Sequence, residues 1–202
     1  MQLDFTTLSP RDAYHWMTAT VTPRPIAWVS TLSAEGVANL APFSFFQVIS
    51  DAPPTLMVNV GLRSDGGLKD SLRNVQATGE LVIQLVSAAQ AEAMNATSAT
   101  LPHGVSEFEH CGIASQASLR VRPPRVLDAP VAFECRLAQV QPYPADAPSC
   151  HLIFAEILLA HIDDRVLDAQ GRIDAGKLDL VGRLGGTAYS RTQQRFHLQR
   201  PS

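Results

Sequence analysis

Hydrophobic residues in this chain gather in short stretches separated by turn-forming residues, and long helical periodicity is rare. The segments 26–32 and 55–60 are rich in β-branched and aromatic residues, which predicts strands. The run at 55–60 is almost continuously apolar, as in a strand covered on both faces. Further strands are expected at 37–40, 45–49, 80–86, 119–121, 131–140 and 151–161, the last two forming a hairpin around 142–148.

Helix signals are local and few. Ser9 is placed to cap a first helix, with Pro10 at its first position and Asp12 in its first turn, and Pro23 should follow its end. A second helix is expected over 66–78, capped by Asp65 and ended by Gly79. Its apolar residues recur at helical spacing, as Leu68, Leu72 and Val75. Helical segments are also expected at 88–94 and 178–184, with a loop-like stretch at 96–117.

The order of these elements favours a mainly β fold. Strands follow one another across turns without the regular strand–helix–strand spacing of a parallel sheet, so the sheet should be antiparallel. Closing six or more such strands into a barrel removes exposed edges. With 202 residues and no break in composition, we expect one domain over 1–202, with a C-terminal extension from about residue 163.

Composition narrows the function. The net charge is −3 and no basic tract occurs, so nucleic acid is not expected as a partner. No apolar run is long enough for a membrane span, and the N-terminus has no signal-peptide pattern, which indicates a cytoplasmic protein. Three cysteines without a CxxC pair and six histidines without metal-binding spacing predict neither disulfides nor a metal site. The low charged fraction of 17% hints that a partner or ligand covers some surface.

The hairpin at 22–48 carries more polar chemistry than a hairpin needs. Arg24 stands between two prolines at one end, and Asn39, Pro42 and Ser44 gather near two phenylalanines at the other. Such a set suits a flat anionic ligand. An arginine in a stiff surface turn and aromatic residues in an ordinary core would give the same pattern.

A glycine-rich turn at 61–71 precedes the second expected helix. Gly67 stands where a P-loop requires lysine, so a nucleoside-triphosphate site is rejected. The helix start still offers free N–H groups to an anion, next to Lys69, Ser71 and Arg63. An ordinary capped helix with solvated charges is the simpler interpretation, favoured by roughly two to one from the turn alone.

The segment GRLGGTAYSR at 182–191 holds two glycines between Arg183 and Tyr189. It is either a loop leading into a tail or a backbone brought close to a ligand. Neither a GxSxG elbow nor a GxGxxG fingerprint occurs in the chain, so hydrolase and Rossmann chemistry have no support.

Several motifs in order resemble one family. The stretches PRPIAWVSTLSAEGVANLAPFSFF, DAPPTLMVNV, KDSLRNVQATGELVIQLV, EAMNATSATLP, SEFEHCGI and GRIDAGKLDLVGRLGGTAYSR are similar to those of the flavin reductase-like FMN-binding split barrels. Within that family the chain resembles the reductase components of nitrilotriacetate-type two-component monooxygenases. The resemblance implies a homodimeric, six-stranded Greek-key split barrel with a few peripheral helices, and FMN near the subunit interface.

The resemblance also implies site residues. Those expected along the isoalloxazine or ribityl chain are Thr31, Asn39, Ala41, Pro42 and Ser44. Those expected near the phosphate are Arg24, Lys69, Asp70 and Ser71, and the C-terminal motif supplies Arg183, Gly186 and Tyr189. Ser71 replaces a common threonine and keeps the hydroxyl, whereas Thr187 replaces a frequent asparagine. His151 stands where some reductases place a histidine near the nicotinamide, and no catalytic side chain is otherwise assigned.

The activity implied by the resemblance is NAD(P)H:flavin reduction, in which FMN is the cofactor and FAD is a possible substrate. Reduced flavin would go to a monooxygenase partner or to oxygen. Because the cofactor carries the hydride chemistry, the lack of an acid–base dyad or nucleophile in the sequence fits this reading. The alternative is an FMN-binding carrier or redox partner without NAD(P)H turnover. A pyridoxamine-phosphate oxidase-like or haem-binding split barrel is a third reading.

Overall fold

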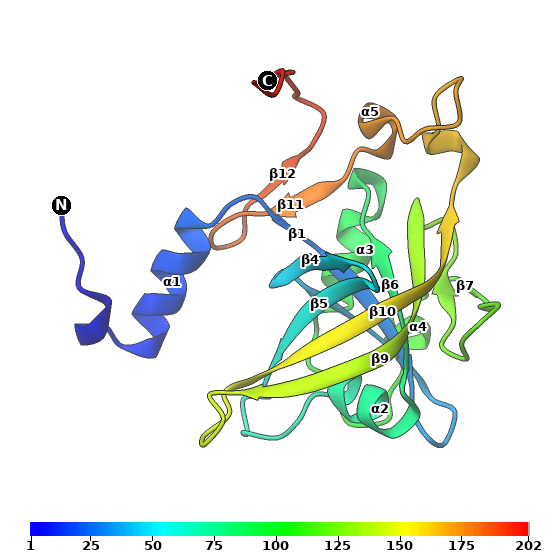
Figure 1. The fold of residues 1–202 in the computed structure, drawn as a ribbon. Coiled ribbons are helices and arrows are strands. Elements are labelled where there is room, and N and C mark those ends of the chain that lie inside the picture. The colour runs from blue at the N-terminus through cyan, green and yellow to red at the C-terminus, as the bar shows by residue number, and fades with distance from the viewer. Residues whose placement is uncertain (202) are drawn as a thin grey trace.

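An antiparallel sheet of seven strands, in the order β3-β2-β6-β9-β10-β5-β4, forms the body of the protein (Figure 1). The computed structural model describes residues 1–201, and Ser202, the end of the predicted extension, lies outside the described residues. The strands are β2 (Ala27–Leu32), β3 (Ala38–Phe43), β4 (Phe46–Asp51), β5 (Pro54–Gly61), β6 (Glu80–Leu85), β9 (Val131–Tyr143) and β10 (Cys150–Ile162).

The two edges of this sheet belong to one continuous segment. β3 and β4 lie at opposite ends of the strand order, yet only Ser44 and Phe45 separate them in the chain. The Phe45 carbonyl accepts a hydrogen bond from the Asn59 N–H at 2.8 Å. Counted as one bent strand, 38–51 closes the sheet into a six-stranded barrel, so the predicted mainly β split barrel is confirmed.

Smaller elements surround the barrel. A three-stranded sheet joins β1 (Arg24–Pro25), β11 (Val181–Arg183) and β12 (Tyr189–Arg191), and β7 (Ser115–Gln116) pairs with β8 (Arg125–Val126). The helices are α1 (Pro10–Thr20), α2 (Asp70–Thr78), α3 (Ala91–Ala96), α4 (Glu107–His110) and α5 (Ala175–Leu178). Short 3-10 turns lie at Phe5–Thr7, Ala88–Gln90 and Asp164–Val166. No helix among residues 1–201 has the length and apolar character to cross a membrane.

Two apolar layers hold the barrel together. Its interior contains Val29, Val58 and Ile83, and the buried Leu72 and Val75 of α2 join the same cluster. On the outer face of β2, Trp28 packs with side chains from α3 and α4, among them Met94 and Phe108. Each fully buried side chain of this size contributes about 1.5–3 kcal/mol. α2 is therefore held by the interior of the barrel, whereas α3 and α4 are held against the outer face of the β2–β3 hairpin.

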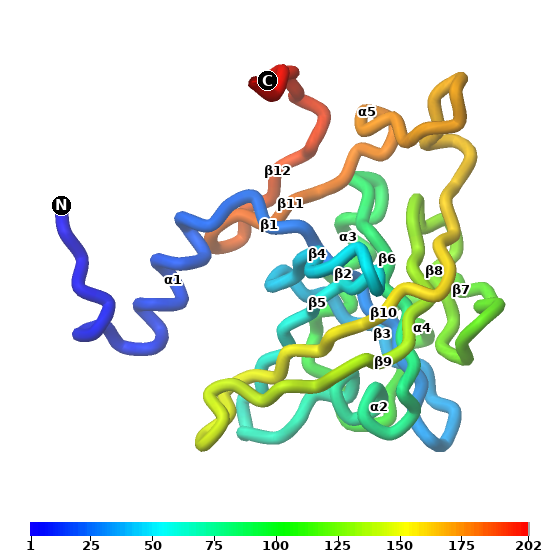
Figure 2. Tube along the Cα trace, in the orientation of Figure 1, coloured from blue at the N-terminus to red at the C-terminus, as the bar shows by residue number. Residues whose placement is uncertain are grey.

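The prediction for α1 is confirmed in detail. Ser9 accepts a hydrogen bond from the Asp12 N–H at 3.1 Å, Pro10 is the first helical residue, and Thr20 is the last. The helix nevertheless stands away from the barrel (Figures 1 and 2). Thr18 is its one buried residue. Tyr14, Trp16 and Met17 are exposed, although the Tyr14 ring lies 6.3 Å from the Phe45 ring, centre to centre.

The second predicted helix begins later than expected. α2 starts at Asp70 with Lys69 as N-cap, because residues 63–67 form a separate tight turn. The Asp65 carboxylate accepts from the Gly67 N–H at 2.9 Å, so Asp65 caps that turn instead of the helix. Gly79 ends α2 in a left-handed conformation, with φ 71°, as predicted. The later start places Lys69, Asp70 and Ser71 together at the helix N-terminus.

Other local predictions were wrong where distant groups decide the backbone. No strand forms at 119–121, because the N–H groups of Leu119 and Arg120 donate to the Glu134 carboxylate. The helix expected at 178–184 is replaced by α5 and β11, which pairs with β1. The stretch 96–117 contains α4 and β7 in addition to loops. β5 is buried on one face only, since Leu56, Val58 and Val60 are buried while Met57 and Asn59 are half-buried.

Candidate functional site

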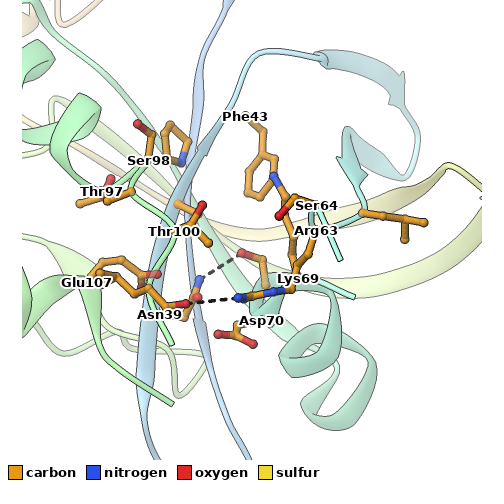
Figure 3. Close-up of a pocket in the computed structure, with 16 residues that line it drawn as sticks. Asn39, Phe43, Arg63, Ser64, Lys69, Asp70, Thr97, Ser98, Thr100 and Glu107 are labelled. Carbon is orange, nitrogen blue, oxygen red and sulfur yellow. Dashed lines mark hydrogen bonds between the residues drawn. The ribbon is translucent and has the colours of Figure 1, made fainter. Parts of the chain in front are cut away.

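A cavity of about 280 Å³ opens between β3, the start of α2 and the loop that follows α3 (Figure 3). It lies at the end of the barrel where the buried β2–β3 hairpin meets α2. Of the predicted site residues, Asn39, Ala41, Pro42, Lys69, Asp70 and Ser71 line it. Further lining residues are Phe43, Leu62, Arg63, Ser64, Thr97, Ser98, Ala99, Thr100, Leu101 and Glu107.

Buried amide–hydroxyl pairs fix α2 against the hairpin. The Asn39 side-chain amide donates to the Ser71 hydroxyl at 3.0 Å, and the Asn74 amide donates to the Thr31 hydroxyl at 3.0 Å. Thr31 is completely buried and does not line the cavity. The sequence reasoning placed Thr31 against the ligand, whereas the structure places it one layer behind, holding α2 in position.

Two cations, Lys69 and Arg63, border the cavity, and the Arg63 guanidinium lies 3.7 Å from the Asp65 carboxylate. The Lys69 ammonium lies 5.6 Å from the centre of the Phe43 ring. Burial lowers the pKa of Lys69, and the nearby Arg63 guanidinium lowers it further. Among residues 1–201 the Lys69 ammonium has no ion pair. A partly desolvated cation at a helix N-terminus is a strong position for an anion.

The loop after α3 supplies hydroxyl groups that the sequence reasoning missed. Thr97, Ser98 and Thr100 all line the cavity. Thr97 is held in place, since its hydroxyl accepts from the Trp28 indole at 2.9 Å and donates to the Met94 carbonyl at 2.7 Å. The Arg63 guanidinium also reaches the Leu101 carbonyl at 3.4 Å. The available signal was the run of hydroxyl residues directly after a short helix.

Two carboxylates also border the cavity, each in a different setting. Asp70 contacts the His103 ring, with Oδ1 and Nδ1 2.6 Å apart. Glu107, which the sequence reasoning did not select, is 7% exposed and accepts from the Leu40 N–H at 2.8 Å. Burial raises the pKa of Glu107, and the negative charge of Asp70 adds to the effect.

A second cavity of about 190 Å³ adjoins the first. The two share Pro42, Phe43 and Ser98 as lining residues. The predicted Ser44, Arg183 and Tyr189 line the second cavity together with Tyr14 of α1. The Arg183 guanidinium lies 4.5 Å from the centre of the Tyr189 ring and donates to the Gly186 carbonyl at 2.5 Å. The structure therefore brings the C-terminal motif beside the hairpin, next to the cavity of Lys69.

Arg24 is not brought to either cavity. Its Nη1 donates to the carbonyls of Thr18 and Val21 at 2.7 Å each, and its Nη2 donates to the Leu184 carbonyl at 3.0 Å. The side chain lies 7% exposed between the end of α1 and the C-terminal segment. The expectation that Arg24 and Lys69 form one anion pocket was wrong, because backbone carbonyls already occupy most of the Arg24 donors.

His151 lies elsewhere in the barrel. His151 of β10 lies opposite Val60 of the neighbouring strand β5. It lies on the same face of β10 as the buried Ile153 and Ala155. Its Nδ1 is buried without a hydrogen-bond partner among residues 1–201. His151 lines neither of the two adjoining cavities.

The site thus combines an anion-binding helix start, uncharged polar groups and aromatic walls in a barrel of split topology. This combination would suit an elongated ligand with an anionic end. Residues 17–177 match the family described as the flavin reductase like domain, and the chain belongs to that family.

The relatives agree with this assignment. An uncharacterised protein of Aquifex aeolicus is 42% identical over 176 residues, covering 87% of this chain and 88% of its own. The structure of nitrilotriacetate monooxygenase component B from Bacillus cereus is 30% identical with a TM-score of 0.93, covering 98% of each chain. The 2-nitrobenzoate 2-nitroreductase of Pseudomonas fluorescens is 29% identical with a TM-score of 0.89, over 100% of this chain and 97% of its own.

Proposed function

We propose that this protein is an NAD(P)H-dependent flavin reductase that binds FMN and supplies reduced flavin, with a monooxygenase component as the candidate consumer. The observation that carries the proposal is the Lys69 ammonium at the start of α2, which has no ion pair among residues 1–201 and borders a cavity lined largely by hydroxyl and amide groups. FMN has a phosphate for that position and a polyol chain for the groups around it. The family and the likeness to a monooxygenase component B support the choice of flavin and of partner.

In this proposal the residues divide by their place in the cavity. Lys69, Arg63 and the N–H groups at the start of α2 hold the phosphate, and Asp70 and Ser71 position that helix start. Asn39, Ala41 and Pro42 face the ribityl chain and the ring. Bound flavin would supply the hydride chemistry, and the protein binds it, orients it and excludes water. Ser44, Arg183, Gly186 and Tyr189 shape the adjoining cavity, where a nicotinamide or a second substrate would lie.

We also propose a homodimer. α1 stands away from the barrel with Trp16 and Met17 exposed, and Val48 and Ile49 of the edge strand β4 are exposed at 67% and 49%. Apolar faces of this kind are covered in stable assemblies. Because Tyr14 of the same helix lines the second cavity, dimer formation would also fix one wall of the site. The three free cysteines agree with a cytoplasmic setting.

The experiment is to measure oxidation of NADH and of NADPH by the purified protein, with and without added FMN or FAD. Flavin-dependent oxidation of either donor is the expected result. Tight FMN binding without oxidation of either donor would contradict the reductase and favour the flavin carrier. A preparation with haem absorbance and no flavin binding would contradict both.

A further inference from the structure

Glu107 presents an unusual carboxyl group to the proposed flavin cavity. It is the first residue of α4, and one of its oxygens, Oε2, accepts from the Leu40 N–H of β3 at 2.8 Å. β3 is an edge strand, so this N–H requires an acceptor outside the sheet. The contact explains why an acceptor stands at position 107, but it does not explain why the group is an acid.

Apart from the Leu40 N–H group, only the N–H group of Glu107 itself acts on this carboxyl as a donor among residues 1–201. Among residues 1–201 no hydrogen bond to Oε1 and no ion pair of Glu107 occurs. Glu107 nevertheless lines the cavity, beside Asn39 in Figure 3. A buried carboxylate without a positive partner is costly, and such groups keep a proton instead.

The charges around the cavity lead to the same conclusion. The cations are Arg63 before α2 and Lys69 at its start, and Arg63 lies 3.7 Å from the Asp65 carboxylate. The nearest acid on α2 is Asp70, which contacts His103 of the loop before α4. The titratable neighbours at the end of α4 are His110 and Cys111. An ionised Glu107 would add a third negative charge to those of Asp65 and Asp70 beside the two cations, and it would oppose the binding of a phosphate. Burial has the largest effect and raises the pKa of Glu107. The Leu40 and Glu107 N–H groups lower this pKa, and the negative charge of Asp70 raises it.

We propose that Glu107 faces the ligand as a neutral carboxylic acid, a hydrogen-bond donor in the flavin cavity, and that binding of FMN takes up a proton at this residue. The inference rests on the proposed function, since it assumes that the phosphate-bearing flavin occupies this cavity. A neutral Glu107 leaves the charge of Lys69 and Arg63 available, and the bound phosphate in turn favours the protonated acid. Linkage then requires that FMN affinity falls as pH rises through the pKa of Glu107 in the free protein.

The test compares the wild-type chain with Glu107→Gln and with the control Glu109→Gln. Glutamine keeps an oxygen for the Leu40 N–H but cannot ionise, so the fold is retained while the titration is removed. Glu109 lies on the same helix and is exposed. FMN is titrated by quenching of flavin fluorescence from about pH 6 to about pH 9, and proton uptake is measured by calorimetry in buffers of different ionisation enthalpy.

The expected result is that wild type and Glu109→Gln lose FMN affinity by up to about tenfold per pH unit more than Glu107→Gln. Calorimetry should show uptake approaching about one proton per flavin in wild type at alkaline pH.

The direction of proton exchange separates two mechanisms. Preferential binding of the FMN phosphate dianion by Lys69 and Arg63 would release protons instead of taking them up. Equal pH slopes in wild type and Glu107→Gln, or proton release by wild type, would overturn the inference alone. No binding of FMN to wild type would overturn the proposed function as well. If Glu107→Gln fails to fold, the same calorimetry on Lys69→Arg decides, because arginine keeps the positive charge but does not titrate in this pH range. Uptake that persists in Lys69→Arg supports Glu107, and uptake that disappears overturns the inference.

Discussion

Lys69 is the residue that gives the cavity its chemistry. Its ammonium is partly desolvated and lies 5.6 Å from the Phe43 ring centre, and the nearby Arg63 guanidinium lowers its pKa further. The free protein gains little from keeping a cation there. A bound phosphate would relieve the repulsion between the two cations and form charge-assisted hydrogen bonds.

Lys69→Ala should therefore weaken FMN binding by about 1.5–3 kcal/mol, or roughly 10- to 150-fold in Kd, because one charge-assisted phosphate contact is lost. Riboflavin has no phosphate, so its affinity should change much less. Lys177→Ala is the matched control, since Lys177 is the other lysine of the chain and contacts the Leu167 carbonyl away from the cavity. Fluorescence titration of both flavins measures the effect, and an equal loss for riboflavin and FMN would refute the phosphate position.

Glu134 shows how one residue organises a segment far from the site. The carboxylate is completely buried, accepts from the Leu119 and Arg120 N–H groups at 2.8 and 2.5 Å, and contacts the His161 ring at 2.5 Å. Burial alone would raise its pKa, but these N–H groups and His161 together bring the pKa below the ordinary 4.5.

Because the folded-state pKa of Glu134 is lowered, its contribution to stability is present above about pH 4.5 and is lost as pH falls through the folded value. Glu134→Gln should cost about 3–5 kcal/mol near neutral pH, since the Leu119 and Arg120 N–H groups and the His161 ring lose their charged acceptor. The variant should also lose stability less steeply below pH 4.5. Denaturant unfolding over a pH series measures both, with the exposed Glu92→Gln as control. Parallel acid profiles for wild type and Glu134→Gln would contradict the assignment.

At the scale of elements, local signals predicted what local interactions decide. α1 follows from Ser9, Pro10 and Asp12, and the end of α2 follows from Gly79. The start of α2 was misplaced because Asp65, four residues before the helix cap Lys69, caps a separate turn. β11 could not be predicted, since its partner strand lies about one hundred and sixty residues earlier, with Arg24 opposite Arg183.

The candidate site could likewise be predicted only in part from the sequence. Asn39, Pro42 and Lys69 reach the cavity through elements that the sequence predicts, and the family resemblance indicates their purpose. Glu107 and the hydroxyl groups at 97–100 were missed because they lie in a stretch without periodicity. Arg24 was misassigned because a Pro-flanked arginine looks the same in sequence whether it binds phosphate or backbone carbonyls.

Arg24 instead joins three elements, and its loss should loosen their arrangement. Arg24→Ala leaves the Thr18, Val21 and Leu184 carbonyls without their donor, so we expect a loss of about 1–3 kcal/mol in unfolding free energy. Denaturant titration measures it, and the exposed Arg73→Ala serves as control. A large loss of FMN affinity with unchanged stability would restore Arg24 to the phosphate site.

At the scale of the whole molecule, the barrel buries its own apolar interior, whereas α1 lies largely outside that core. A helix that buries Thr18 alone contributes little to the fold of its own chain. In the proposed homodimer, a second copy would cover its exposed aromatic and apolar residues.

Trp16→Glu should weaken the proposed dimer at least tenfold, because a charge would replace an aromatic side chain in a desolvated contact. Sedimentation velocity over a dilution series measures the change. Arg11→Glu also adds negative charge to an exposed position of α1, and it should have a much smaller effect. A monomeric wild-type protein at all concentrations would contradict the dimer, whatever the variants do.

The central claim is that flavin bound in the Lys69 cavity accepts hydride from a nicotinamide. The most direct measurement is stopped-flow mixing of the FMN-loaded protein with NADH and then with NADPH, under anaerobic conditions, while the absorbance of oxidised flavin is followed. We predict rapid, donor-dependent bleaching with at least one nucleotide, faster than that of free FMN at the same concentration. Bound flavin that stays oxidised with both nucleotides would contradict the reductase.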